Sequence, residues 1–475
     1  MNFFHLLETV KNVIWSPPLL IFIVGASIYL TFVLKGLQFR YLFYALKLAF
    51  FTKESKTEEK AAGELSHFQS LMTILASAIG TGNIAGVATA IVTGGLGALF
   101  WMWIIAFLGM SLKYSESLLA VKYRLKNSKG EMSGGPMHYL SQGLAWKKIG
   151  LVYAFLGIFA TIGTGNMVQV NSVADAMHSM FSFNKLACGF ILCFLTAWVM
   201  FGGVKFIGRI AEIFVPLMAC LYLFGGCTII FNNLHLLPNV LTKIVCEAFT
   251  GSAAFGGFAG SSIIISMQAG ISRSIFSSEA GLGTSSIASA STRTNQACKQ
   301  AMISMTSVFI STIVVCTITG IVIGMTELLG QIDEQTGNLL NGAPMAIKAF
   351  DSQLRGGAYI VSLGLVFFAY STILGWAYYG EKCFEYIFGT KYIFVYRCVY
   401  TVCMIPAAIL ELAPIWTLAD ITNGLMIVPN VLALLALRKV LRNETDLFCT
   451  EIKSTGQNQP ESIESKPTKV LLERS

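Results

Sequence analysis

Charged residues are scarce in this sequence: Asp, Glu, Lys and Arg make up only 12% of its 475 residues. Soluble globular chains carry about 25%. Hydrophobic residues make up 55%, and the mean hydropathy is +0.66. This balance excludes an ordinary soluble domain and predicts an all-α polytopic membrane protein.

Motifs for metal binding and for acid–base chemistry are also lacking. The 11 Cys residues have no C-x-x-C spacing and are interpreted as small buried hydrophobes. The five His residues form no H-E-x-x-H pattern. No pair of carboxylates lies in the middle of an apolar stretch. These absences argue against an enzyme and against a bound cofactor. The formal charge of +8 comes without a basic domain long enough to bind nucleic acid.

Long apolar stretches are abundant, and those of about 20 residues predict membrane spans. Two shorter segments, 134–145 and 238–249, are interpreted as interfacial pieces. Eleven stretches are predicted to be transmembrane helices: 17–35, 68–93, 97–121, 151–171, 185–203, 209–231, 250–270, 300–325, 357–380, 392–411 and 414–437.

The basic residues predict an orientation. With the N-terminus outside, most of the 33 Lys and Arg residues fall in inside loops and in the tail. We therefore expect a multi-pass protein of a bacterial-type inner (plasma) membrane with a cytoplasmic C-terminus. The chain divides into a leading helix and cytoplasmic loop (1–67), a first five-helix unit (68–231), a second five-helix unit (232–437) and a cytoplasmic tail (438–475) that is expected to be disordered.

Glycine interrupts two of the predicted spans. Unwound backbone survives in a bilayer only against protein or a cavity, and paired interruptions in two halves of a chain indicate the site of a secondary transporter. The affected spans are the first and sixth after the leading helix, so the two five-helix units are expected to form an inverted repeat with two discontinuous helices. The glycines are Gly80, Gly82 and Gly86 in one span, and Gly251, Gly256, Gly257 and Gly260 in the other.

A second copy of the sequence IGTGN, at 162–166, does not fit this repeat. It is attributed either to chance or to close packing against the span 68–93. Gln169, one turn later and near mid-span, is the more suggestive residue in that segment.

An interrupted helix offers two kinds of ligand. Free N–H groups after the break suit a carboxylate, and free carbonyls before it suit a cation or an ammonium group. Hydroxyls from another helix would complete a cation shell, and Ser371 and Thr372 are candidates. The alternative is that these hydroxyls only bond back to a carbonyl of their own helix, and residue type does not decide between the two.

Three sequence blocks resemble the alanine or glycine:cation symporter family: GGLGALFWMWIIAFLG (94–109), GGPMHYL (134–140) and GISRSIFSSEAGLG (270–283). The order of the blocks fits from Leu19 to about Arg442. The resemblance implies a leucine-transporter-like fold with five-plus-five inverted helices and an extra leading helix. It also implies sodium- or proton-driven uptake of small amino acids.

The resemblance also implies a sodium site. The carbonyls of Ala76 and Ile79 would bind the ion together with the hydroxyls of Ser371 and Thr372. Some relatives of this fold have a second sodium site that uses a hydroxyl of the sixth core helix. The matching position is interpreted as Ala253, which has no hydroxyl and argues against a second ion.

The substrate site implied by the resemblance lies at the first interruption. The amides of Thr81 and Gly82 would hold the substrate carboxylate, and Gly80 would let the backbone approach. The pocket would be completed by side chains from several spans, namely Asn83, Gln169, Phe258 and Trp376.

Three ionisable residues near the family motifs are interpreted as structural. Glu279 is placed on an inside loop, where a salt bridge is favoured over a gating role. Lys113 and Glu116 are spaced i, i+3 on one helix and are predicted to pair near the inner face.

The sequence thus predicts a secondary active transporter in the lipid bilayer. It would couple inward sodium flow to uptake of a small neutral amino acid, alanine or glycine, by alternating access. The alternative is a proton-coupled or passive facilitator or channel, which shares a polar midplane but, if passive, cannot accumulate substrate. The pocket residues do not separate alanine from glycine, serine or D-alanine, and nothing indicates the oligomeric state.

Overall fold

Helices form nearly all of the regular structure in the computed structural model, which describes residues 3–52, 61–250, 259–332, 337, 339–455 and 471–472. The described strands are two residues long each. β1 (Leu125–Lys126) pairs antiparallel with β2 (Met132–Ser133) and parallel with β3 (Leu471–Leu472). The prediction of an all-α architecture therefore holds in the described residues.

Seven helices or helix series among the described residues are long and apolar enough to cross a membrane, and one bent pair adds an eighth. Three other predicted spans fall on α12 (Lys185–Phe201), α15 (Ala259–Ser278) and α21 (Ile393–Val402). The number eleven and the repeat organisation therefore remain predictions. The seven are built from α1 (Phe3–Ile14) with α2 (Pro17–Val33), α8 (Gly97–Lys122), α10 (Lys147–Ala160) with η3 (Thr161–Met167) and α11 (Val168–Phe181), α13 (Gly203–Asn232), α17 (Ala297–Val308) with η5 (Phe309–Cys316) and α18 (Thr317–Gly324), α20 (Gly357–Phe388), and α23 (Leu412–Ala436).

Shorter helices connect or cover these spans. Their bounds are α3 (Leu37–Arg40), α4 (Leu42–Phe51), α6 (His67–Ala78), η1 (Gly82–Gly86), α7 (Val87–Gly94), α9 (Pro136–His138), η2 (Tyr139–Gly143), α14 (Leu237–Thr250), α16 (Ser286–Ala290), α19 (Gly342–Gln353), η6 (Thr390–Tyr392), α22 (Met404–Ala407) and α24 (Arg438–Thr455).

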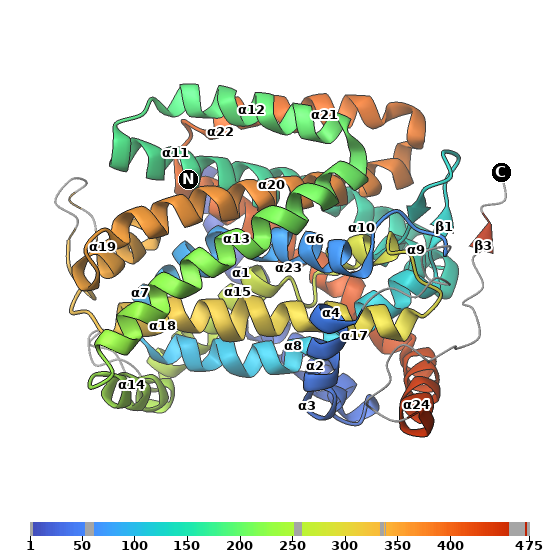
Figure 1. The fold of residues 1–475 in the computed structure, drawn as a ribbon, viewed down its shortest axis with the longest axis horizontal. Helices are drawn as coiled ribbons and strands as arrows, with labels where there is room; N and C mark the ends of the chain where they lie inside the picture. Colours follow the sequence, from blue (N-terminus) through green and yellow to red (C-terminus); the bar gives the residue numbers. More distant parts are fainter. Residues whose placement is uncertain are drawn as a thin grey trace.

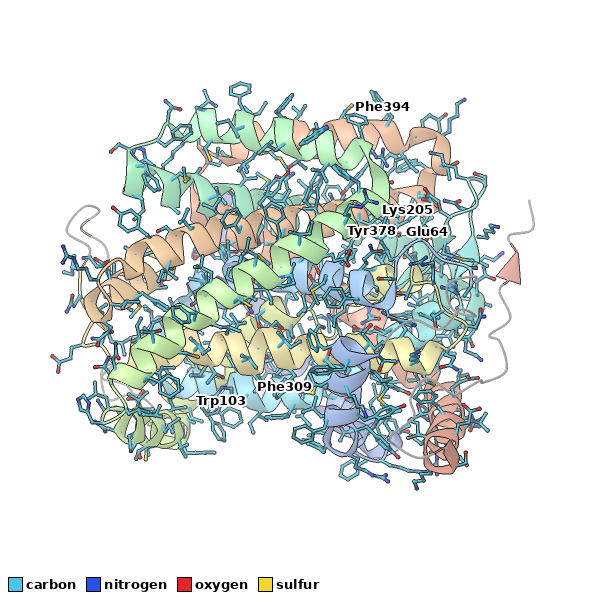
Figure 2. All side chains as sticks on the ribbon, viewed as in Figure 1. Glu64, Trp103, Lys205, Phe309, Tyr378 and Phe394 are labelled. Atoms are coloured by element: carbon cyan, nitrogen blue, oxygen red, sulfur yellow. The ribbon has the colours of Figure 1, made fainter. Side chains whose placement is uncertain are left out.

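The long helices pack side by side, and α8 contacts both α15 and α17. In Figure 1, α8 and α17 lie in the lower half, α20 runs above them, α13 slopes from the lower left to the upper right, and α12 and α21 lie along the upper edge. The apolar window of α8 is 83% buried, whereas that of α13 is 33% buried. Peripheral helices expose large apolar side chains, such as Phe394 at the upper edge of Figure 2, which is 63% exposed. Such a surface suits lipid.

The first helix interruption lies where the sequence predicts it. α6 starts with a capping box, in which Ser66 Oγ accepts from the Gln69 N–H and the Gln69 side chain accepts from the Ser66 N–H. The helix ends at Ala78, and Ile79 is extended. The chain resumes as η1 and α7, bent by 52° from α6.

The predicted second interruption lies largely outside the described residues, but the described chain has a break after α15 that is called the second interruption below. Of the four glycines used for the prediction, Gly251, Gly256 and Gly257 lie outside the described residues, and Gly260 lies inside α15. The described break comes between α15 and α16, at residues 279–285. Glu279, Gly281 and Gly283 have positive φ angles there, which two of these residues adopt readily as glycines.

Two helices at the chain ends were not predicted. α1 runs along α23, and Gly424 is needed there because a Cβ would lie 2.5 Å from Ile14 Cγ2. Residues 438–455, assigned to a disordered tail, form α24. Leu441, Phe448 and Ile452 are buried, and their helical spacing gives α24 an apolar face.

The predicted interfacial segments are both short helices. Residues 134–145 contain α9 and η2, and residues 238–249 lie in α14. Figure 1 shows α14 end-on, across the direction of α8 and α15. The helix therefore covers one end of the long helices.

Candidate functional site

Two hydroxyls of α20 face the open end of α6. Thr372 Oγ1 lies 2.9 Å from the carbonyl oxygen of Ala76 and 3.3 Å from that of Ile79. Ser371 Oγ lies 3.4 Å from the Ala76 oxygen. Both hydroxyls also lie 2.9 Å from the carbonyl oxygen of Phe368 in their own helix. The structure thus brings together all four residues of the predicted sodium site.

This oxygen cluster has more acceptors than protons. The carbonyl oxygens of Ala76 and Ile79 lie at the end of α6, whereas that of Phe368 also accepts from the Thr372 N–H within the continuous helix α20, and the two hydroxyls supply only two further protons. In a continuous helix the Gly80 N–H would bond to the Ala76 oxygen, but it donates to Asn83 Oδ1 at 3.1 Å instead. The surplus of oxygen lone pairs suits a hard cation, while the bonds to Phe368 show that helix back-bonding occurs as well.

Backbone N–H groups lie on the other side of the interruption. The Thr81 N–H donates to Gln169 Oε1 at 3.2 Å, and Gln169 Nε2 donates to the Thr164 oxygen at 3.1 Å. An amide oxygen thus occupies the position predicted for a carboxylate at a helix N-terminus. Gly80 is required here because a Cβ would lie 2.5 Å from Thr372 Oγ1 and 3.1 Å from Gln169 Oε1.

The Asn83 side chain holds the interruption together. Its Oδ1 accepts from the Gly80 N–H, and its Nδ2 donates to the Ser311 oxygen at 2.8 Å and contacts Cys316 Sγ at 3.3 Å. Thr319 Oγ1 donates to the Asn83 oxygen at 2.9 Å. The buried amide is therefore fully paired, as a polar group at this depth requires. A direct contact of Asn83 with substrate stays a prediction.

Trp376 forms a wall one helical turn from Thr372. Its side chain is 1% exposed, and its Nε1 donates to the Ser77 oxygen at 3.3 Å. The second IGTGN segment, within η3, packs here: a Cβ at Gly165 would lie 2.2 Å from Trp376 Cβ. The close packing is thus against α20, and not against the first interrupted helix.

The predicted contribution of Phe258 cannot be placed, because this residue lies outside the described residues. The part of α15 that faces the first interruption carries Phe276, whose ring would lie 2.6 Å from a Cβ at Gly82. The next residue, Ser277, has a hydroxyl. Ala253, on which the argument against a second sodium rested, also lies outside the described residues, so that argument stays a prediction.

Glu279 lies in the second interruption and not on an inside loop. The residue is 0% exposed and has a φ of +57°. Thr284 Oγ1 donates to Glu279 Oε2 at 3.0 Å, and the carboxylate lies beside the side chains of Ser77 and Trp376. In the described part of the chain Glu279 forms no ion pair, so the predicted salt bridge is absent there.

Lys113 and Glu116 support the second interruption instead of pairing with each other. Lys113 Nζ donates to the Ser278 oxygen at 2.8 Å. Glu116 Oε1 accepts from the Gly281 N–H at 2.9 Å and from Asn430 Nδ2 at 2.8 Å. Both side chains are 0% exposed. Their structural interpretation is consistent with these contacts, but their partners differ from the prediction.

On the α6 side, the interrupted helices are closed by contacts that we call the Arg124 latch. The Glu64 N–H donates to the Ser291 oxygen and the Arg293 N–H to the Leu65 oxygen, both at 2.8 Å. Burial lowers the pKa of Arg124 to about 10, against the opposing charge of Glu64, so the guanidinium stays charged at neutral pH. It donates to four carbonyl oxygens, those of Ala62, Ala290, Thr292 and Thr294.

On the α15 side, α15 and α23 meet in contacts that we call the Arg273 latch. Arg273 donates to Asp420 Oδ2 at 2.7 Å, with side chains 12% and 9% exposed. The guanidinium lies 4.9 Å from the ring centre of Trp416, which stacks on Phe276 at 4.8 Å. Trp15 Nε1 donates to the backbone carbonyl oxygen of Asp420 at 2.9 Å. This bond holds the end of α1 against α23.

The residues of the Arg273 latch were missed in the sequence. A usable signal was present, because ionisable side chains inside membrane spans are rare and mark functional sites. Asp420 lies inside the predicted span 414–437, whereas Arg273 lies just beyond the predicted span 250–270, so the signal applies to Asp420. Trp416 and Phe276 carry no comparable signal, since aromatic residues are frequent throughout the chain.

Comparisons with known proteins place the chain among transporters. The sequence model described as the sodium:alanine symporter family matches residues 1–463. The sodium/alanine symporter AgcS of Methanococcus maripaludis is 46% identical over 465 residues, which cover 96% of this chain and 100% of AgcS. The probable sodium/glutamine symporter GlnT of Bacillus subtilis is 34% identical and covers 92% of this chain and 89% of GlnT.

A solved structure shares the fold. The crystal structure of MhsT in complex with L-phenylalanine matches with a TM-score of 0.57. The match covers 81% of this chain and 99% of MhsT at 13% sequence identity. The likeness supports the predicted leucine-transporter-like architecture and says nothing further about ligands.

Proposed function

Because the chain belongs to the sodium:alanine symporter family, we propose that it takes up alanine or glycine with sodium by alternating access. Membership makes it a sodium-coupled amino-acid symporter of the plasma membrane and not an enzyme. The choice of substrate, the direction of the termini and the transport cycle are the proposed parts. The observation that carries the proposal is the oxygen cluster around Thr372.

Sodium would bind in that cluster. Ala76, Ile79, Ser371 and Thr372 supply oxygens from two helices that must move relative to each other in an alternating-access cycle. An ion bound there would hold α20 against the end of α6. Binding would therefore stabilise one arrangement of the interruption, which is how an ion gradient can be coupled to transport.

The substrate carboxylate would replace Gln169 at the Thr81 N–H. In the structure Gln169 Oε1 satisfies that donor, and its Nε2 already bonds to the Thr164 oxygen. An arriving carboxylate could accept from the Thr81 N–H and from the Gln169 amide at the same time. The interaction would be charge-assisted and therefore stronger than the amide contact it replaces.

The walls of the site favour a small side chain. Trp376 fills the space next to Ser77, and its packing against Gly165 leaves it no room to withdraw. The relative AgcS is named for alanine, whereas GlnT at lower identity is named for glutamine. We therefore assign alanine or glycine to this chain, with glutamine as the control substrate.

Sodium and substrate should bind cooperatively. An ion that orders residues 79–81 also fixes the Thr81 N–H that would receive the carboxylate. By linkage, the factor by which sodium raises the affinity for alanine must equal the factor by which alanine raises the affinity for sodium.

The two latches would close opposite sides of the membrane. With the basic loops in the cytoplasm, the Arg124 latch would close the inner side and the Arg273 latch the outer side.

Uptake by the purified full-length chain in proteoliposomes tests the proposal. Alanine should accumulate with an inward sodium gradient and not with a pH gradient alone. One relative, YrbD of Bacillus subtilis, is named a putative sodium/proton-dependent alanine carrier, so the proton arm is needed. Equal uptake without either gradient would show a passive facilitator.

A pair of substitutions at one position tests the ion site. Thr372→Ala removes the hydroxyl and should raise the sodium concentration for half-maximal uptake by about tenfold or more, since a buried ligand to a charge is lost. Thr372→Ser keeps the hydroxyl and should stay within about threefold of the wild type. If both variants respond to sodium like the wild type, the ion binds elsewhere.

A further inference from the structure

Glu279 is a buried carboxylate that forms no direct ion pair within the described chain, although the charge of Lys113 acts on it. Within the described chain, three other buried carboxylates are paired: Asp420 with Arg273, Glu381 with Arg397 and Glu385 with Lys382. Glu279 accepts one hydroxyl, from Thr284, on Oε2, and its Oε1 has no hydrogen-bond partner. An ionised carboxylate in such a place is costly unless something compensates it.

The side chain of Glu279 points toward the proposed substrate site. Its carboxylate lies beside Ser77, the residue before the last one of α6, and beside Trp376, the wall of the pocket. On α20, Trp376 is one turn from Thr372. Glu279, which lies beside Trp376, is therefore close to the turn of α20 that follows the oxygen cluster. The second interruption, with φ of +57° at Glu279, is what turns the side chain this way.

One lysine serves two carboxyl groups around the second interruption. Lys113 acts on both Glu116 and Glu279, and all three side chains are 0% exposed. Lys113 Nζ and Glu116 Oε1 are each already bonded to groups of the interruption. A cationic group of a ligand would therefore add a second positive charge next to these two carboxyl groups.

We propose that the Glu279 carboxylate binds the α-ammonium group of the transported amino acid. This assignment rests on the proposed function. Thr81 and Gln169 would hold the carboxylate end of the zwitterion, and Glu279 Oε1 would accept from the ammonium end. The contact is a charge-assisted hydrogen bond, which is among the strong ones. Glu279 would thereby select amino acids over hydroxy acids and fatty acids of equal size.

Sodium fits the Glu279 carboxylate less well than an ammonium group does. The oxygens around Thr372 already form a shell for the ion without any carboxylate. An ammonium group donates hydrogen bonds, and Glu279 Oε1, which has no hydrogen-bond partner, offers an acceptor for one of them beside Ser77. If the coupling ion nevertheless binds at Glu279, the sodium response will report it.

Discrimination between alanine and lactate tests the assignment, because lactate carries a hydroxyl in place of the ammonium group. The assay is inhibition of labelled alanine uptake by unlabelled alanine or by L-lactate, at saturating sodium. In Glu279→Gln the affinity for alanine should fall about 30-fold or more, while that for lactate stays the same or improves. The ratio of the two affinities should therefore collapse.

Two further variants make the result specific. Glu116→Gln changes a carboxylate of the same interruption that faces Asn430, and should keep the alanine-to-lactate ratio whatever it does to the rate. Glu279→Asp keeps the charge on a shorter arm and should give an intermediate ratio. It also replaces Glu279→Gln if that variant fails to fold.

The outcomes separate this inference from the proposed function. If the wild type shows no sodium-driven alanine uptake, the proposed function fails. If the wild type transports but Glu279→Gln keeps the ratio, the ammonium assignment alone fails. A shift in sodium affinity at an unchanged ratio would also overturn it, in favour of a cation site at Glu279.

Discussion

Arg124 and Arg273 each close one side of the candidate site, but with different kinds of partner. Arg124 bonds to four backbone carbonyls and is reinforced by backbone hydrogen bonds between residues 61–65 and 290–294. Arg273 bonds to one carboxylate and lies over two aromatic rings, those of Trp416 and Phe276. The Arg124 latch is held by hydrogen bonds to the backbone, whereas the Arg273 latch is held by contacts between side chains.

This difference indicates how each side can open. Separating the Arg124 latch requires the segments before α6 and after α16 to move apart as units, with several hydrogen bonds lost together. A Cβ at Gly63 would lie 2.4 Å from the Thr292 oxygen, which shows how closely the two segments pack. The Arg273 latch can open by rotation of Arg273 and Trp416 about their side-chain bonds. We expect the structure to open first on the α15 side.

Arg124→Ala should have the largest effect. It leaves four carbonyls without their donor, and bonds to charged groups contribute about 1.5–3 kcal/mol each. We expect uptake to fall about tenfold or more because the α6 side no longer closes. The measurement is uptake together with labelling of a cysteine introduced at Ser70 by a membrane-impermeant thiol reagent. Ser70 belongs to α6, and its hydroxyl donates to the Ala288 oxygen of α16.

Arg124→Lys is the matched control. A lysine keeps the charge but cannot reach four carbonyls from one nitrogen, so an intermediate effect is expected. The exposed Cys220 and Cys246 should be replaced by Ser in all variants to lower background labelling. If labelling at position 70 is the same with and without Arg124, this residue does not close the α6 side.

Asp420→Asn should have a smaller effect on the other side. The substitution keeps the shape of the side chain and removes its charge, while Arg273 retains its contact with Trp416. We expect the substrate concentration for half-maximal uptake to rise about fivefold, with little change in maximal rate, because the occluded state is less stable. Initial rates over a series of alanine concentrations measure this.

Trp416→Phe separates charge from stacking. It keeps an aromatic ring over Phe276 and should change uptake by less than about twofold. Equal losses in Asp420→Asn and Arg124→Ala would remove the difference between the two latches on which the expected order of opening depends.

The first interruption could be predicted because its signals are local. Gly80, Gly82 and Asn83 stand together in an apolar stretch, and the backbone breaks at that point. Helix content and most span positions follow from hydropathy in the same way. The grouping of Ala76, Ile79, Ser371 and Thr372 came from the family resemblance, since no spacing rule connects residues almost 300 positions apart.

The break at residues 279–285 was not predicted, and the predicted interruption around Gly256 lies outside the described residues and stays a prediction. The described break depends on Gly281 and Gly283, whose φ angles are positive. Which segment faces Gly82 is set by packing of α15 on α7, which one sequence does not encode locally. The roles of Phe276, Glu279 and Trp416 depend on that register.

Glu64 offers the smallest and most selective test of the Arg124 latch. Its Oε1 accepts from the Met132 N–H at 2.8 Å, and it lies near Tyr378, beside which Figure 2 labels it. Burial raises the pKa of Glu64 above its ordinary value, while Lys382 and Arg124 act to lower it and Glu131 acts to raise it. The closed latch therefore binds a proton more tightly than an open one would.

The sign of the pH effect follows from this shift. Protonated Glu64 favours closure, and this contribution is lost as the pH rises through the raised pKa. Labelling of the cysteine at position 70 should therefore increase as the pH rises through the raised pKa of Glu64, by less than about twofold. Glu64→Gln, neutral at every pH, should flatten this trend, and Glu131→Gln should leave most of it. A trend that persists in Glu64→Gln would assign the proton to another group and leave the α6 closure independent of this carboxylate.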